Sequence, residues 1–234
     1  MAAGANRSSL VITAALAAVA LGALPVHAAE TGLSGLWLLE RGQFGGREAP
    51  ALTPAAAADM EVQRKNPRVM TDISRLCLPV GMPRMMVNEL PLEIVESPER
   101  IAIVSEQTEL GRTVYMNTAV HPSDTPPAWN GNSYGKWEGS TLVVDTIGFN
   151  DRTTHIPGTA KGSTSTHLVE KYHLENGGKV LVIEMTFDDP KVLTRPYTVS
   201  YRYDRQPAGA QRWEYVCDTQ DPGWNSALGV KPGK

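Results

Sequence analysis

Residues 135–146 constrain the fold of this chain more than any other segment. They read GKWEGSTLVVDT, and the glycines supply a turn geometry that other residues resist. Leu142, Val143 and Val144 follow as a short β-prone run. Residues 146–151 then carry polar side chains that can bond to the backbone of a turn. The segment therefore predicts a turn that leads into a buried strand, which ends at a second turn.

Similar β-prone runs recur at short, regular spacing along most of the chain. Turn signals separate them, and the Asn-Gly-Gly sequence at 176–178 is a strong hairpin signal. We expect one helix, which begins after a capping Thr53, has Pro54 in its first turn and continues to Arg64. The expected strands are residues 34–39, 92–96, 101–106, 112–117, 141–146, 167–174, 179–187, 197–204 and 212–218.

This succession predicts an all-β fold, namely an antiparallel lipocalin-like β-barrel with one short N-terminal helix. Closing the sheet into a barrel removes the edge strands that would otherwise aggregate. A β-sandwich is the main alternative. Residues 121–133 are expected to form a long proline-rich loop. In 179–187 both alternating faces are partly apolar, which suits a strand whose second face meets a cavity or another layer.

Residues 1–29 have the pattern of a secretory signal peptide. Arg7 precedes an apolar run at 10–24, which is shorter than the roughly 20 residues of a membrane span, and small residues follow at a cleavage site. We expect residues 30–234 to form a single β-barrel domain that is soluble and periplasmic or secreted, without membrane insertion after signal cleavage. The formal net charge of −3, with no basic run, argues against nucleic acid as a partner.

Cys77 and Cys217 are the two cysteines of the chain. In an oxidising compartment an even count predicts a disulfide, and two free buried thiols are the alternative. Closing so long a loop would stabilise the fold by roughly 4–5 kcal/mol in the chain-entropy account. The bridge would tie an irregular early segment to the last expected strand.

Several motifs make the chain resemble a family of secreted bacterial proteins. The family carries a GxWEGxTLVVDT…FND motif, and its pattern is similar to that of lipocalin-like (calycin) barrels, whose first strand also contains Gly-x-Trp. The resemblance covers most of the chain after the signal and implies an exported barrel more than it implies a mechanism. The matching segments here are 77–84, 135–146, 149–151, 170–172 and 189–190.

The chain departs from the family pattern at three places. Ser140 stands where the family usually has Asp, Lys171 stands where it has Arg, and residues 162–163 are Gly-Ser where it has His-Ser. The resemblance implies that any chemistry of that His is missing here, or is performed by His155 or His167 instead.

The spacing motifs of several other chemistries do not occur in the sequence. No Cys or His pair has the close spacing of a zinc site, and no Gly-x-Ser-x-Gly elbow presents a nucleophile. No phosphate-binding or dinucleotide pattern follows a strand. A haem-binding barrel needs one axial His, for which His155 or His167 could serve. We predict no metal site and no cofactor.

General acid–base chemistry inside the barrel is the enzymatic hypothesis. Asp145, Glu170, Glu184 and His167 lie on apolar strands or at their ends. A carboxyl group among apolar side chains has a raised pKa, which prepares it for proton transfer. The candidate catalytic residues are His167, Asp145 and Glu170. Alternatively, these side chains bond to turn backbone or form outward ion pairs.

Aromatic and thioether side chains favour the binding of an apolar molecule. They give adaptable apolar contacts, although plain core packing is the alternative. We therefore expect an exported soluble barrel that binds a small apolar or aromatic molecule. A cofactor-free lyase or isomerase and a structural envelope protein are the competing hypotheses. The expected ligand-binding residues are Trp137, Tyr172, Glu184, Tyr201 and Met85.

Overall fold

A computed structural model describes residues 1, 32–42, 48–65, 78–106, 110–116, 121–122, 124–152, 156–157, 159 and 161–213. The predicted signal peptide beyond Met1, both cysteines of the predicted disulfide (Cys77 and Cys217) and His155 lie outside the described residues. The elements are β1 (Gly35–Leu39), α1 (Pro54–Lys65), β2 (Leu92–Glu96), β3 (Arg100–Ser105), β4 (Arg112–Met116), β5 (Asn132–Glu138), β6 (Thr141–Ile147), β7 (His167–Glu175), the short 3-10 turn η2 (Asn176–Gly178), β8 (Val180–Asp188) and β9 (Tyr197–Arg205).

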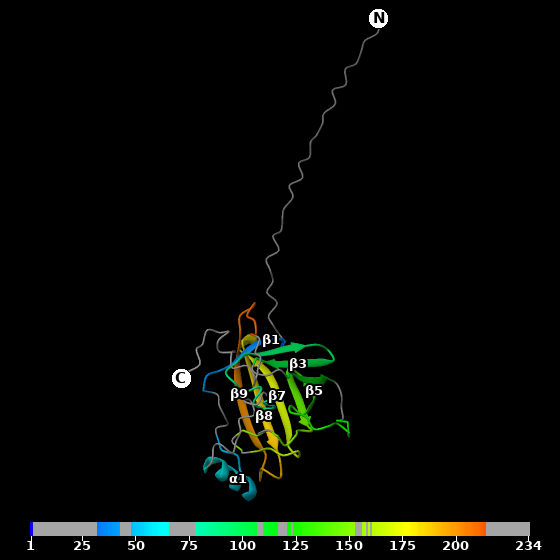
Figure 1. Cartoon of the computed structure of the whole chain (residues 1–234). Coiled ribbons are helices and arrows are strands. Elements are labelled where there is room, and N and C mark those ends of the chain that lie inside the picture. Colours follow the sequence, from blue (N-terminus) through cyan, green and yellow to red (C-terminus); the bar gives the residue numbers. More distant parts are fainter. Residues whose placement is uncertain are drawn as a thin grey trace, which may run out of the picture.

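The nine strands close into one barrel in chain order (Figure 1). Each strand pairs with the next, and β1 also pairs with β9, with Leu39 opposite Tyr203. The prediction of an all-β barrel with one short N-terminal helix is therefore confirmed, and a β-sandwich is not formed by the described strands. One pair departs from the antiparallel expectation, because β4 and β5 run parallel, with Tyr115 opposite Tyr134.

The connection between β4 and β5 explains how two parallel strands can be neighbours. Parallel strands cannot be joined by a tight hairpin, so the chain must return along the barrel before β5 begins. In the described part of this connection Ala128 forms a parallel bridge with Phe149, and the Ala128 N–H donates to the Gly148 carbonyl at 2.8 Å. The predicted proline-rich loop is thus this crossover, and it ends at residue 131 because Asn132 begins β5.

The predicted turn before the strand 141–146 is present but shorter than expected, since residues 135–138 complete β5 and residues 139–140 form the turn. Gly135 is needed there for space and not for a turn, because an added Cβ would lie 2.8 Å from both Met116 Sδ and Val114 Cγ1. The turn falls at Gly139, whose φ of 62° is in the left-handed region that favours glycine. Of the expected strand 212–218, residues 212–213 form no strand, and the rest lies outside the described residues.

The inner face of the barrel is mostly apolar and buried. Alternate residues of each strand point inward. Of the two alternating faces in residues 179–187, one therefore lies in the core. On β9 the alternate tyrosines and one valine are also buried. The inward residues of these two strands are Leu181, Ile183, Met185, Phe187, Tyr197, Val199, Tyr201 and Tyr203.

The two ends of the barrel differ. The helix α1 lies at one end (Figure 1), where the predicted cap Thr53 accepts a hydrogen bond from the Ala56 N–H at 3.3 Å. No residue of α1 is buried. At the opposite end the Arg205 guanidinium lies 4.1 Å from the centre of the Trp37 ring.

No helix in the described part of the chain is both long and apolar enough to cross a membrane.

Candidate functional site

A charged pair lies inside the barrel between β4 and β7. Arg112 begins β4 and Glu170 is in the middle of β7, and both side chains are buried, with residue exposures of 2% and 0%. Arg112 Nη1 donates to Glu170 Oε1 at 2.9 Å, and Arg112 Nη2 donates to Glu170 Oε2. This two-point geometry is the strongest that a guanidinium and a carboxylate can form.

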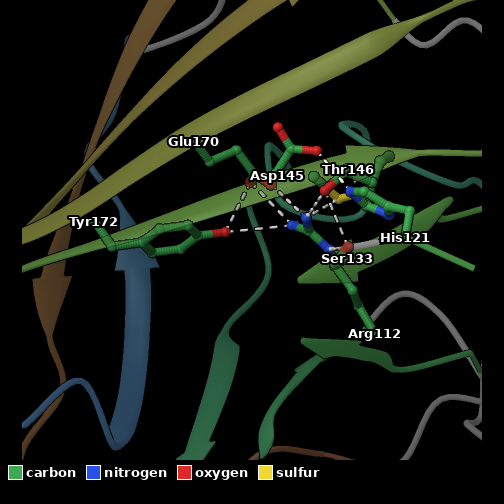
Figure 2. A network of polar contacts seen from close by, with 8 residues as sticks. Arg112, His121, Ser133, Asp145, Thr146, Glu170 and Tyr172 are labelled. Carbon is green, nitrogen blue, oxygen red and sulfur yellow. Dashed lines mark hydrogen bonds and ion pairs between the residues drawn. The ribbon is translucent and has the colours of Figure 1, made fainter. Parts of the chain in front are cut away.

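Three hydroxyl groups complete what we call the interior network (Figure 2). Ser133 on β5 accepts from Arg112 Nε at 3.0 Å, and Thr146 on β6 accepts from Arg112 Nη2 at 2.9 Å. Tyr172 on β7 donates to Glu170 Oε1 at 2.7 Å, while its oxygen lies 3.3 Å from Arg112 Nη1. All five side chains are buried, so the network is a polar island in an apolar interior.

Electrostatics fix the protonation of Arg112 and Tyr172 at neutral pH. Burial on its own would lower the pKa of Arg112, but the neighbouring Glu170 carboxylate raises it above its ordinary value. Burial raises the pKa of Tyr172 well above its ordinary value, and the charge of Glu170 raises it further. The guanidinium is therefore charged, and the phenol keeps the proton that it donates.

Methionine side chains pack against the interior network. Met82 Sδ lies 3.6 Å from Arg112 Nη1, and Met82, Met85 and Met86 are all buried. They belong to residues 78–91, which form neither helix nor strand. The Tyr203 hydroxyl donates to the Met86 carbonyl at 3.0 Å and holds this segment in place. A thioether sulfur is a weak acceptor, so Met82 makes the weakest of the contacts to the guanidinium.

A second polar group, the outer His–Asp cluster, lies on the opposite face of the sheet. Asp145 points outward from β6, and its oxygens lie 2.6 Å from His121 Nε2 and 2.8 Å from His167 Nε2. The His121 ring meets the Tyr134 ring edge-on at 4.6 Å. Partial burial on its own would raise the pKa of Asp145, but the hydrogen bonds from His167 and His121 bring it below its ordinary value. The carboxylate thereby fastens the β4–β5 crossover to the barrel wall.

The three predicted catalytic residues do not converge in the structure. Glu170 faces the interior, whereas Asp145 and His167 lie on the outer face with side-chain exposures of 44% and 43%. Neighbouring residues of a strand point to opposite faces, so the register that turns Thr146 inward turns Asp145 outward. The expectation that all three are inside the barrel is therefore wrong, and Glu170 is the one that lies there.

The predicted ligand-binding residues also separate. Glu184 lies on the outer face of β8, 3.8 Å from Lys171 Nζ, so its expected place in the interior is wrong. Trp137 is at the end of β5 and is 44% exposed, which places it at the rim. The three that are buried inside are Tyr172, Tyr201 and Met85.

Sequence reasoning missed Arg112 and His121. The sequence does contain a signal for Arg112, because this residue alternates with Val114 and Met116 and is thus a charged residue on an apolar strand face. The sequence contains no such signal for His121, since its contact with Asp145 depends on the path of the crossover.

Among the described residues, no group of three or more His, Cys, Asp or Glu side chains is arranged to hold a metal ion.

Comparison with known proteins shows a distant similarity at the level of structure. No protein-family model and no curated protein matches the sequence. Among solved structures, the chain is similar to a crystal structure of a mutant of the fluorescent protein UnaG. The two share 12% identity with a TM-score of 0.34, and the match covers 77% of this chain and 99% of that chain.

Proposed function

We propose that the protein is an exported barrel that binds a small apolar or aromatic molecule in its interior, with the interior network as the polar anchor. The buried pair Arg112–Glu170 is the observation that carries this proposal. Replacing a buried ion pair by apolar residues of similar volume is often neutral or stabilising, so stability alone gives little reason to keep one. A charged pair in an otherwise apolar interior therefore favours a role in recognition.

The surroundings of the interior network support an apolar or aromatic ligand. Tyr201, Phe187 and Met85 are fully buried within the same core as the anchor. Methionine side chains are flexible and polarisable, so they can repack around a guest. Because residues 78–91 form no strand, their side chains can move without breaking the hydrogen bonds of the sheet. A ligand would take the space near Arg112 that Met82 fills.

Native mass spectrometry of the protein isolated from its own cells tests the proposal. We expect a retained organic molecule that denaturation releases. The double variant Arg112→Met with Glu170→Leu removes the anchor without leaving an unpaired charge and should lose the molecule. The matched control, Lys171→Met with Glu184→Leu, removes an ion pair on the outer face of β7 and β8 and should keep the molecule.

Two results would contradict ligand binding. One is wild-type protein that is isolated empty and binds no uncharged aromatic probe. The other is a double variant, Arg112→Met with Glu170→Leu, that is folded and retains the molecule as well as wild type does.

Export is tested separately by cell fractionation. N-terminal sequencing of the mature protein should show that it begins near residue 30.

A further inference from the structure

Arg112 is the only buried basic side chain in the described part of the chain. A lone buried guanidinium would be a natural anchor for a carboxylate or another anion. Here Glu170 already occupies it through two parallel contacts, one of them Nη1 to Oε1 at 2.9 Å. The pair as a whole is neutral, although each partner is charged.

The remaining donors of Arg112 show what a ligand could replace. Nε donates to Ser133 and Nη2 donates to Thr146, so these hydrogen atoms are directed at oxygen acceptors. Beyond Glu170, Nη1 donates to the Tyr172 oxygen at a long 3.3 Å and also faces the weak thioether acceptor of Met82 at 3.6 Å. A carbonyl, ether or hydroxyl oxygen in that place would be a better acceptor than sulfur. An uncharged ligand would thus improve the weakest contact of the anchor.

An anionic ligand would meet a different environment at the same place. Its charge would lie beside the carboxylate of Glu170, and like charges repel strongly where water is excluded. The described residues offer no second buried cation to balance it. An unpaired charge in an apolar interior is strongly disfavoured.

We propose that Glu170 sets the charge selectivity of the barrel, so that the interior accepts uncharged molecules with a hydrogen-bond acceptor and rejects carboxylates and other anions. This inference rests on the proposed function, because it requires that a ligand enters the interior. It assigns Glu170 a role in specificity and not in catalysis.

Two fluorescent probes with the same ring skeleton test the selectivity. Phenylnaphthylamine is uncharged, and anilinonaphthalene sulfonate adds one negative charge to it. Both are titrated into wild type, Glu170→Gln and Glu184→Gln, with near-UV circular dichroism to establish that each variant is folded. Glu184→Gln is the matched control, since it removes the same charge from the outer face of β8.

We expect wild type and Glu184→Gln to bind the uncharged probe at least about tenfold more tightly than the anionic one. Glu170→Gln leaves the charge of Arg112 without a counter-ion and should improve binding of the anionic probe by about tenfold or more, with one probe per protein. A loosened fold would also take up the anionic probe. The double variant Arg112→Met with Glu170→Leu controls for this, because its interior lacks both charges and should show no gain.

The outcomes separate the two proposals. Binding of neither probe to wild type overturns the proposed function and the selectivity with it. Binding of both probes with equal affinity, or an equal gain for the anionic probe in Glu170→Gln and in the double variant, overturns the selectivity alone. In that case the barrel still binds ligands, but Glu170 does not select them.

Discussion

Arg112 and Glu170 compensate each other's buried charge. Removing one partner leaves a buried charge without compensation, so we expect Arg112→Met alone to lower the free energy of unfolding by about 3–5 kcal/mol. Adding Glu170→Leu should restore most of that loss, because the double variant buries no charge. Urea denaturation of wild type, both single variants and the double variant measures the coupling.

The outer ion pair of Lys171 and Glu184 is the control for this cycle. Its side chains are 55% and 43% exposed, so Lys171→Met should change the free energy of unfolding by less than about 1 kcal/mol. A loss in Arg112→Met no larger than that in Lys171→Met would contradict the assignment of a tightly coupled buried pair.

Asp145 makes the stability of the fold depend on pH. Its pKa is lowered in the folded protein from an ordinary value of 3.8, so its contribution is present above that value and is lost as the pH falls through the folded-state pKa. We expect Asp145→Asn to be less stable than wild type at neutral pH, by under about 1 kcal/mol because the carboxyl is partly exposed. Thermal unfolding below pH 3.8 should show the two proteins converging.

Asp204→Asn serves as the comparison for Asp145→Asn. Asp204 is exposed on β9 and lies outside the outer His–Asp cluster. The same loss of charge should leave the acid dependence of unfolding close to that of wild type. A constant difference between Asp145→Asn and wild type from neutral to acid pH would show that the carboxylate charge is not what stabilises the crossover.

At the scale of single residues, the sequence indicated some interior groups but could not separate the two faces of β6 and β7. Glu170 and Tyr172 share one face by simple alternation, and both were candidates. His167 is three residues from Glu170 on the same strand, so alternation puts the two on opposite faces but does not say which face is inside. Asp145, on β6, lies on the outward face. A shift of one residue exchanges inside and outside, so strand position alone did not distinguish a buried anchor from a surface contact.

At the scale of elements, the parallel pair β4–β5 depends on a small side chain. Gly135 faces Met116 across the pair, and an added Cβ would lie 2.8 Å from both Met116 Sδ and Val114 Cγ1. We expect Gly135→Ala to destabilise the fold by about 1–3 kcal/mol, the range for overpacking a core. Thermal or urea unfolding measures the loss.

Gly111→Ala is the matched control at the start of β4. There the nearest atoms to an added Cβ are Val104 Cγ2 at 3.4 Å and the Ile103 carbonyl oxygen at 3.5 Å, which is ordinary van der Waals contact. Its stability should stay within about 0.5 kcal/mol of wild type. If both alanine variants unfold alike, close packing at the parallel pair is not the reason for Gly135.

Elements with local signals were predicted well, and elements set by distant contacts were not. Thr53 and Pro54 mark the start of α1, and the Asn-Gly-Gly turn joins β7 to β8. β5 was missed because Gly135 resembles a turn residue when its partner strand is unknown. The parallel direction of β4 and β5 was missed for a similar reason, since turn chemistry identifies neighbours along the chain but not across a long crossover.

At the scale of the whole molecule, closure of the barrel involves Arg205 at the last position of β9. Its guanidinium donates to the carbonyls of Ser34 at 2.7 Å and Gly32 at 2.8 Å, and it also covers the Trp37 ring. A lysine keeps the charge but cannot reproduce this planar set of donors. We expect Arg205→Lys to lower the free energy of unfolding by about 1–3 kcal/mol.

Arg202→Lys provides the comparison on the same strand. Arg202 forms outer ion pairs with Glu40 and Glu175 and is 34% exposed, so the change should alter stability by no more than about 1 kcal/mol. Native-state hydrogen exchange should show faster exchange in β1 and β9 for Arg205→Lys. Unchanged protection in β1 would mean that the barrel is closed without help from this side chain.

The pairing of β1 with β9 has a consequence during synthesis of the chain. Residues of β1 leave the ribosome first, yet one side of that strand has no hydrogen-bonding partner until β9 has been made. Pairing between segments so far apart in sequence is slow to form. Until the last strand is made, the first strand therefore has one open side, to which chaperones can bind.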